Sequence, residues 1–326
     1  MKIVIPGGSG QVGTVLARAF QRDGHDVVVL SRGGEAVRTA KSAGSAKSSW
    51  RVVPWDAQRI GSWTAEFEGA DVVVNLAGRS VNCRYNARAR REIMESRVRS
   101  TRLVGEAIGA ARNPPRVWLQ ASTATIYAHR YDAPNDEGTG IIGGDEPDAP
   151  DTWKFSIEVA KAWERAVDES PTPGTRKVKL RSAMVMSPDK DGIFDTLLTL
   201  VRRGLGGTAA DGRQYISWIH ETDFIRSLYW LIGREDMDGA VNVAAPNPLP
   251  NKEFMRILRN AAGVRIGLPA TRLMLEAGAF FMRSETELIL KSRRVVPGRM
   301  LEAGFDFVFP QWEQAARDLC ERARAS

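Results

Sequence analysis

The stretch KIVIPGGSGQVGTVLARAF, residues 2–20, decides the fold of this chain. Its apolar run at residues 3–6 predicts a buried strand, and the apolar residues at helical spacing after the glycines predict a helix that ends at Gly24. A strand that runs through a glycine-rich loop directly into a helix is typical of the first unit of a nucleotide-binding α/β sheet.

Glycines stand three residues apart in the loop between this strand and this helix. Gly8, Gly10 and Gly13 satisfy the spacing G-x-G-x-x-G, and Gly7 adds the even spacing G-x-x-G-x-x-G. Glycine permits the tight turn and lets the backbone approach a pyrophosphate, which the free N–H groups at the helix N-terminus attract. We therefore predict that the loop binds a dinucleotide, through Gly7, Ser9, Gly10, Gln11, Val12 and Gly13.

The end of the second predicted strand, HDVVVLSR at residues 25–32, indicates which dinucleotide binds. A carboxylate there would accept from the ribose 2′-hydroxyl of NAD, but this chain has Ser31 and Arg32. Because an arginine favours a 2′-phosphate, we predict NADP(H). Asp56, after the third strand, is placed to accept from the adenine amino group. Further cofactor contacts are expected from Leu76, Ala77, Gly78, Arg97 and Ala121.

Short runs rich in valine, isoleucine and leucine alternate with helical patterns over the first half of the chain. This alternation predicts an α/β fold, a Rossmann-type doubly wound parallel sheet covered on both faces. The looser second half predicts a smaller C-terminal substrate lobe and a mostly helical tail. The NADP-binding domain is expected to span residues 1–187, with a further contribution from about 215–246. The substrate lobe is expected at 188–214 and 247–268, and the helical appendage at 269–326.

Composition and charge bear on the partners, the metal content and the location of the protein. The chain has 326 residues and a net charge of +7, but its arginines interleave with glutamates on predicted helices, so we expect no nucleic-acid partner. Its two cysteines, Cys83 and Cys320, show neither a disulfide pattern nor metal-ligand spacing, so we expect no metal site and a cytoplasmic, reducing location. We expect no signal peptide, because residues 2–5 already read as a strand, and no membrane span, because no apolar run is long enough for one.

Several motifs resemble the extended short-chain dehydrogenase/reductase group: GGSGQVG at 7–13, NLAG at 75–78, LQASTATIY at 119–127 and LRSAMVMS at 180–187. A narrower resemblance is to epimerase-family proteins that carry a C-terminal domain of unknown function. It rests on ESRVRSTRLV at 95–104, SWIHETD at 217–223 and the stretch 295–319. The resemblance implies a Rossmann-type domain, a smaller substrate lobe and a dinucleotide, and it implies no settled substrate.

Catalysis in the broader family needs a serine or threonine, a tyrosine, and a lysine four residues after the tyrosine. Thr123 fits the first position, four residues before Tyr127, with Ser122 beside it. The resemblance places the tyrosine position at Ser156 and the lysine position at Ala160. A serine hydroxyl is far too weak an acid to replace a phenol at neutral pH, so another group must move the proton if the protein is an enzyme.

Four side chains remain candidates for that proton transfer: Tyr85, Tyr127, Tyr131 and His220. Each also has a structural interpretation, since Tyr127 resembles a residue that packs beside the site, Tyr131 lies in a polar loop, and His220 follows an apolar strand. Cys83 has no histidine base nearby in the sequence and is expected to be inert.

Basic residues suggest the charge of the substrate. Arg97 falls where the broader family often has an asparagine near the active site, so it would pair with a phosphate or carboxylate, or form an ion pair on a helix surface. Arg84 is a second substrate candidate, with Trp218 and His220 as contacts from the substrate lobe. By fold analogy, these residues favour an anionic, sugar-nucleotide-like substrate.

Two functions remain open at this point. The first is an NADP(H)-dependent oxidoreductase or epimerase of the short-chain dehydrogenase/reductase type with unusual proton-transfer residues, and the second is a non-catalytic NADP(H) sensor. The enzyme needs an open pocket beside Thr123 with a titratable group, whereas Trp153, Phe155 or Trp218 would fill that pocket in a sensor. The long helices predicted at 86–112 and 153–169 either form a homodimer interface or cover the sheet.

Overall fold

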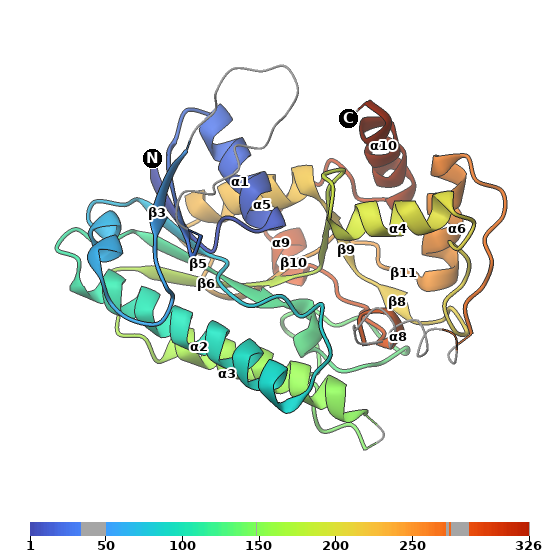
Figure 1. The fold of residues 1–326 in the computed structure, drawn as a ribbon, viewed down its shortest axis with the longest axis horizontal. Coiled ribbons are helices and arrows are strands. Elements are labelled where there is room, and N and C mark those ends of the chain that lie inside the picture. Colours follow the sequence, from blue (N-terminus) through green and yellow to red (C-terminus); the bar gives the residue numbers. More distant parts are fainter. Residues whose placement is uncertain (34–49, 148, 272–273, 275–286, 326) are drawn as a thin grey trace.

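A computed structural model describes residues 1–33, 50–147, 149–271, 274 and 287–325 of the chain (Figure 1). A seven-stranded parallel sheet lies at its centre, in the order β10-β6-β5-β4-β1-β2-β3. The strands are β1 (Lys2–Pro6), β2 (Asp26–Ser31), β3 (Arg51–Pro54), β4 (Val72–Asn75), β5 (Val117–Thr123), β6 (Arg176–Ser182) and β10 (Gly239–Val243). The strand order reverses between β1 and β4, which confirms the predicted doubly wound fold and puts a ligand-binding crevice at their carboxyl ends.

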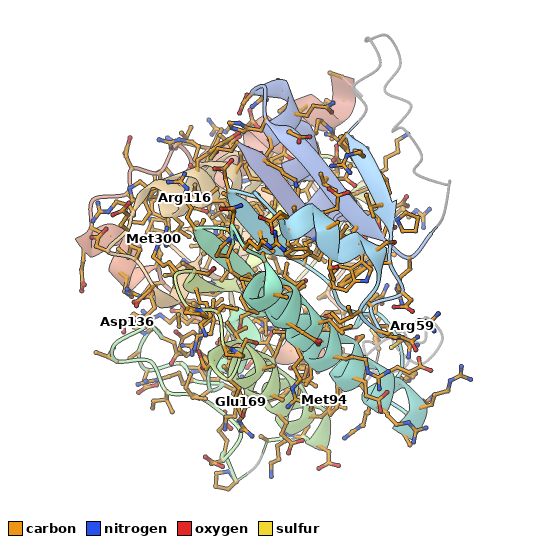
Figure 2. The ribbon with its side chains drawn as sticks, turned by 90° about the vertical axis from the view of Figure 1, so that its left-hand side faces the viewer. Arg59, Met94, Arg116, Asp136, Glu169 and Met300 are labelled. Carbon is orange, nitrogen blue, oxygen red and sulfur yellow. The ribbon has the colours of Figure 1, made fainter. Side chains whose placement is uncertain are left out.

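Helices cover both faces of this sheet (Figures 1 and 2). They are α1 (Gln11–Arg22), α2 (Ala87–Ala110), α3 (Asp151–Asp168) and α5 (Glu221–Gly233), with the short 3-10 segments η1 (Ser62–Phe67) and η2 (Ala124–Ile126). α1 and α5 pack on one face, and α2 and α3 lie together on the other. Apolar residues of α2 pack on the sheet, among them Val104 and Ile108, while Phe155 of α3 packs on the loop after β4.

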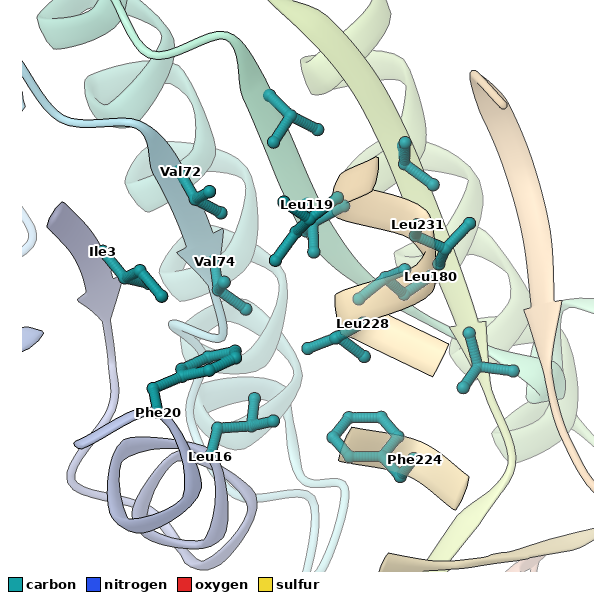
Figure 3. Packing of buried hydrophobic residues seen from close by; sticks show 14 of the residues in the cluster. Ile3, Leu16, Phe20, Val72, Val74, Leu119, Leu180, Phe224, Leu228 and Leu231 are labelled. Carbon is teal, nitrogen blue, oxygen red and sulfur yellow. The ribbon is translucent and has the colours of Figure 1, made fainter. Parts of the chain in front are cut away.

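Successive side chains of each strand point to opposite faces of the sheet, so the hydrophobic core has two layers. Ile3 and Ile5 point toward α1 and α5, whereas Val4 points toward α2. Figure 3 shows the first layer, in which Phe20 of α1 lies against the strands, on the same side as Leu228 of α5. Because both faces of the central strands are buried, their sequences read as continuous apolar runs instead of alternating ones.

A second lobe follows β6. It contains α4 (Ile193–Arg202), α6 (Asn251–Ala262) and α10 (Trp312–Ala325), the small strands β7 (Met184–Met186), β8 (Tyr215–Ile216), β9 (Trp218–His220) and β11 (Leu249–Pro250), and the short helix α8 (Glu287–Leu290). The short helix α9 (Gly298–Glu302) instead packs on β10 of the main sheet. Its core is aromatic, since Trp312 stacks on Phe254 at 4.0 Å between ring centroids and lies 5.0 Å from Trp218. The C-terminal region is helical, as predicted.

The run of residues 178–186 does not form one strand. It breaks at Ala183, whose N–H donates to Val243 of the main sheet, and the following β7 pairs with β9 instead. His220 caps α5, because its Nδ1 accepts from the Thr222 N–H at 3.1 Å.

Membrane-spanning helices are not found: none of the helices in the described residues combines the length and the apolar character that crossing a bilayer requires.

Replacing Phe20 with alanine should lower the free energy of unfolding by about 3–5 kcal/mol, because its ring is fully buried and the core around it cannot collapse. Ile60→Ala is the control, because Ile60 is 43% exposed and its truncation should change stability by about 0.5 kcal/mol or less. Urea unfolding followed by tryptophan fluorescence measures both. Equal losses in the two variants would contradict this description of the core.

Candidate functional site

The glycine loop lies in very close contact with its neighbours. Gly7 has a φ of +75°, and a Cβ on it would lie 2.6 Å from the Ala77 Cα after β4. A Cβ on Gly13 would lie 2.5 Å from the Cα of Gly8, so the first turn of α1 packs directly on the loop. Any side chain at Gly7 or Gly13 would push α1 away from the carboxyl ends of β1 and β4.

The beginning of α1 fits a phosphate. Gly10 caps the helix without a side chain, so it leaves the N–H groups of the first turn to an external acceptor. Beside them, the side-chain Nε2 of Gln11 is buried and has no hydrogen-bond partner in the part of the chain that the structure describes. An anion that accepts from these donors satisfies the first turn of α1, which is the arrangement expected for the pyrophosphate of a dinucleotide.

The residues predicted to select the dinucleotide lie at the carboxyl ends of β2 and β3. Ser31 donates to the hydroxyl of Ser9 in the glycine loop at 3.1 Å, and Arg32 follows as an exposed side chain. Asp56 is also exposed, and its Oδ1 accepts from the backbone N–H of Gln58 at 2.8 Å. The structure therefore brings Ser9, Ser31 and Arg32 together at one end of the sheet.

Arg97 of α2 lies beneath the loop that follows β4, close to Leu76, Ala77 and Gly78. A Cβ on Gly78 would lie 3.2 Å from the Arg97 side chain, and the guanidinium lies 5.0 Å from the ring of Trp163. Its Nη1 donates to the carbonyls of Arg79 and Ile93 at 3.0 and 3.2 Å. The alternative of an ion pair on a helix surface was wrong, because Arg97 is half-buried and none of the described carboxylates pairs with it. Burial lowers its pKa to about 10.

A cavity of about 140 Å³ lies beside Arg97, beyond the end of β5. Five parts of the chain line it: the loop after β4, helix α2, helix α3, the end of β5 with η2, and the C-terminal segment. The lining residues are Val81, Tyr85, Ile93, Arg97, Thr123, Thr125, Phe155, Ser156, Val159, Trp163, Glu287 and Arg293. The predicted positions of the hydroxyl residue, Thr123, and of the missing tyrosine, Ser156, thus share one pocket. We call it the Thr123 pocket.

Ser156 makes the shortest contact in this pocket. Its hydroxyl donates to Oε2 of Glu287 at 2.5 Å, across 131 positions of sequence. Burial, and then the nearby charge of Glu287, raise the pKa of Tyr85 to about 12, while a hydrogen bond with Ser156 acts in the opposite direction. Ala160, at the missing lysine position, is fully buried in an apolar cluster with Tyr127 and Val295, so it offers no replacement cation.

Ser122 and Tyr127 belong to a buried network instead of the Thr123 pocket. Ser122 donates to Glu164 at 2.6 Å, and Glu164 is paired with Arg181 through two hydrogen bonds of 2.8 Å. Arg181 donates to the Tyr127 hydroxyl at 3.0 Å, which in turn donates to Asn242 at 2.9 Å. Burial would raise the pKa of Glu164, but Arg181 lowers it below its ordinary value.

The other predicted substrate contacts lie apart from this pocket. Trp218 and His220 are fully buried in the second lobe. The Nδ1 of His220 caps α5, so the neutral ring carries its proton on Nε2, which donates to Asp318 at 3.0 Å. Arg84 is half-buried in the loop after β4, and Ala121 is half-buried on β5.

None of the three aromatic residues that could have blocked the Thr123 pocket fills it. Trp153 lines a separate cavity of about 550 Å³ with His129 and Tyr131. Phe155 forms part of the wall, where its ring meets Tyr85 edge-on at 5.3 Å between centroids.

Residues 3–244 match the NAD dependent epimerase/dehydratase family. The chain belongs to this family. Residues 270–319 match a domain of unknown function, DUF1731. The human epimerase family protein SDR39U1 is 28% identical over 322 residues, which cover 98% of this chain and 99% of the human protein. YfhF of Bacillus subtilis is 26% identical over 319 residues, 98% of each chain.

Solved structures agree with this family membership. The crystal structure of human SDR39U1 (isoform 2) with NADPH matches with a TM-score of 0.82 and 28% identity, covering 98% of this chain and 99% of that one. A nucleoside-diphosphate sugar epimerase from Corynebacterium glutamicum matches with a TM-score of 0.73 and 26% identity, covering 98% of this chain and 58% of that one.

Sequence reasoning missed the contribution of the DUF1731 region to the pocket of this family member. Lys291 donates to the carbonyl of Thr125 at 2.8 Å, and the Arg293 Nε donates to the hydroxyl of the same residue at 3.1 Å. Glu287 reaches Ser156 from the same segment. The only available signal was the resemblance of residues 295–319 to a family domain, and it did not extend to these side chains.

Replacing Glu164 with glutamine should lower the free energy of unfolding at pH 7 by about 3 kcal/mol, because Arg181 would stay buried without its carboxylate. The pKa of Glu164 is lower in the folded protein than its ordinary value of 4.5. The ionised carboxylate therefore stabilises the fold fully above pH 4.5, and this stabilisation is lost as the pH falls through the pKa of the folded state. The difference between wild type and variant should therefore shrink in acid. Urea unfolding at pH 7 and pH 4 tests this, with Glu253→Gln, an exposed ion-pair residue, as control. A constant difference at both pH values would refute it.

Proposed function

We propose that the protein is an NADP(H)-dependent oxidoreductase or epimerase-like enzyme that acts on an anionic small molecule. The observation that carries this proposal is the Thr123 pocket, in which a hydroxyl, the half-buried cation Arg97 and the titratable groups Tyr85 and Glu287 line one cavity. An oxygen bound between Thr123 and one titratable group has what a hydride-transfer enzyme needs for orientation and for proton transfer.

Three observations support NADP(H) as the cofactor. The first turn of α1 offers donors for a pyrophosphate. The exposed Arg32 offers a guanidinium for a 2′-phosphate, because β2 ends in Ser31 and Arg32 and not in a carboxylate. The human relative SDR39U1 was crystallised with NADPH. When bound, the nicotinamide ring supplies or accepts hydride, and the residues of the chain do the rest.

Each wall of the pocket has a part in this chemistry. Thr123 would hold the reacting oxygen by a hydrogen bond, while Arg97 would neutralise a carboxylate or phosphate of the substrate. Phe155 and Trp163 exclude water, which strengthens these interactions.

The small volume of the cavity limits the part of the substrate that enters it. About 140 Å³ is less than the several hundred cubic ångströms typical of ligand pockets, so only the reacting end of a substrate fits. A sugar nucleotide, suggested by the epimerase from Corynebacterium glutamicum, would have to leave its nucleotide outside. A small hydroxy or keto acid would fit entirely.

A non-catalytic NADP(H) sensor is the second candidate. It is favoured by the apolar surroundings of Ala160, which leave the lysine position of the family without a cation. A sensor has no use for a hydroxyl and a titratable group at the same cavity, so we place it second. We also propose a reducing, cytoplasmic location, because Cys83 and Cys320 are both free.

Replacing Arg32 with alanine should weaken NADPH binding about 10- to 100-fold and leave NADH binding unchanged, because only the 2′-phosphate loses a charged partner. Titration of the intrinsic fluorescence of each reduced dinucleotide measures both affinities. Arg22→Ala, at the far end of α1 and highly exposed, is the matched control and should bind as wild type does. Equal affinity of the wild type for NADH and NADPH would exclude the proposed selectivity.

Thr123→Val should abolish turnover while NADPH binding persists, because the substitution keeps the shape of the side chain and removes only its hydroxyl. A panel of 2-hydroxy acids, 2-keto acids and nucleoside-diphosphate sugars, with neutral alcohols and aldehydes for comparison, is screened by nicotinamide absorbance. Arg97→Met should remove the preference for anions. Unchanged turnover in Thr123→Val would exclude the role of the hydroxyl, and bound NADPH with no turnover on any panel member would favour the sensor.

A further inference from the structure

We propose that Glu287, supplied by the DUF1731 region, is the proton acceptor of the Thr123 pocket and is reached from the substrate through Tyr85 and Ser156. This inference rests on the function proposed above and deepens it. It assigns the proton transfer to residues that come from three separate parts of the chain.

Hydrogen-bond donors fix the direction of this path. A serine hydroxyl has one hydrogen to donate, and Ser156 donates it to Oε2 of Glu287 at 2.5 Å. Its hydrogen bond with Tyr85 must therefore run from the phenol to the serine oxygen. The chain of donors leads from Tyr85 through Ser156 to Glu287, and all three side chains line the same cavity as Thr123.

The surroundings of Glu287 suit a buried proton acceptor. Its side chain is 2% exposed, and Nη2 of Arg293 lies 3.8 Å from its Oε1. Arg293 offsets the charge of the carboxylate from one side, and the Ser156 hydroxyl meets the other oxygen. Buried carboxylates that are held in this way retain their charge without access to solvent.

Tyr85 cannot act as a base alone. Burial, and then the nearby charge of Glu287, raise its pKa to about 12, so the phenol is protonated at neutral pH. It can accept a proton only if it passes its own proton on at the same time. The other charged or titratable groups that face it are Arg97 from α2, which favours ionisation, Cys83 from its own loop, which opposes it, and Arg293 from the C-terminal segment.

In this proton transfer, each bond that breaks is matched by a bond that forms. The O–H bond of a substrate alcohol breaks, and its proton forms a new O–H bond on Tyr85. The phenol proton moves to the Ser156 oxygen, and the serine proton moves to Glu287, which becomes a neutral acid. Tyr85 and Ser156 end as they began, and the electron pair left on the substrate oxygen forms the carbonyl bond as hydride leaves the carbon for the oxidised dinucleotide. Reduction of a carbonyl runs the same path backwards.

Fluorine NMR tests the coupling without a substrate. The chain has five tyrosines, and their replacement by a fluorotyrosine, a more acidic phenol, moves the titration to a pH at which the fold survives. The Tyr85 resonance is the one that Tyr85→Phe removes. Glu287→Gln should lower its titration midpoint by about one pH unit, because a nearby negative charge is lost. Ser156→Ala should raise the midpoint. When Tyr85 ionises, the serine hydroxyl turns to donate to the phenolate, and this charge-assisted hydrogen bond is lost in the variant.

Opposite signs of the two shifts in the Tyr85 midpoint distinguish a proton path through Ser156 to Glu287 from a purely structural role of these residues. Loosened packing would move both midpoints in the same direction, toward that of an exposed tyrosine. An unchanged midpoint in Glu287→Gln, or shifts of the same sign in both variants, overturns the proposal. Glu253→Gln, an exposed carboxylate on α6, is the control and should leave the Tyr85 midpoint unchanged.

The second measurement is the turnover of the substrate found in the screen of hydroxy acids, keto acids, nucleoside-diphosphate sugars, alcohols and aldehydes. Glu287→Gln should lower kcat at least about 100-fold with NADPH affinity unchanged, and Glu287→Asp should recover part of it. Full turnover in Glu287→Gln overturns the path even if the enzyme proposal stands. Absence of NADPH binding in the wild type would instead overturn the proposed function, and the fluorine shifts would still decide whether the three groups are coupled.

Discussion

The close approach of Gly7 to Ala77 is the constraint on which the rest of this structure depends. At 2.6 Å between an imagined Cβ and the Ala77 Cα, no other residue fits without moving β4 away from β1. Gly13 imposes the same limit between α1 and the loop. These two contacts set the crevice where the strand order reverses, direct the first turn of α1 into it, and put the ends of β4 and β5 beside it. The Thr123 pocket lies at the end of β5 because of this arrangement.

Local patterns predicted the parts of the molecule whose structure is determined locally. The glycine loop, the buried parallel strands and the two long helices follow from spacing and periodicity, and the structure has them within a few residues of the predicted positions. Arg97 could be placed near the site because a family motif fixes its turn of α2. Its burial could not be predicted, because that depends on Trp163 from α3 and on the loop above it.

Residues whose partners lie far away in the sequence were predicted less well. Tyr127 was a candidate proton donor on the basis of its motif, but Arg181 from β6 and Asn242 from β10 hold its hydroxyl in a structural network. Glu287 carried no local signal at all, since an isolated glutamate in a helical tail is ordinary. Only the packing of the C-terminal segment on η2, through Lys291 and Arg293, brings it to Ser156.

The path of the C-terminal segment also has a consequence for the order in which the protein matures. During synthesis, N-terminal regions fold first, and the strands and loop that fit a dinucleotide are all present once β10 has emerged from the ribosome. At that stage the Thr123 pocket lacks the wall formed by Glu287 and Arg293. The loop and strands that fit a dinucleotide are thus synthesised before the residues that complete the wall of the Thr123 pocket.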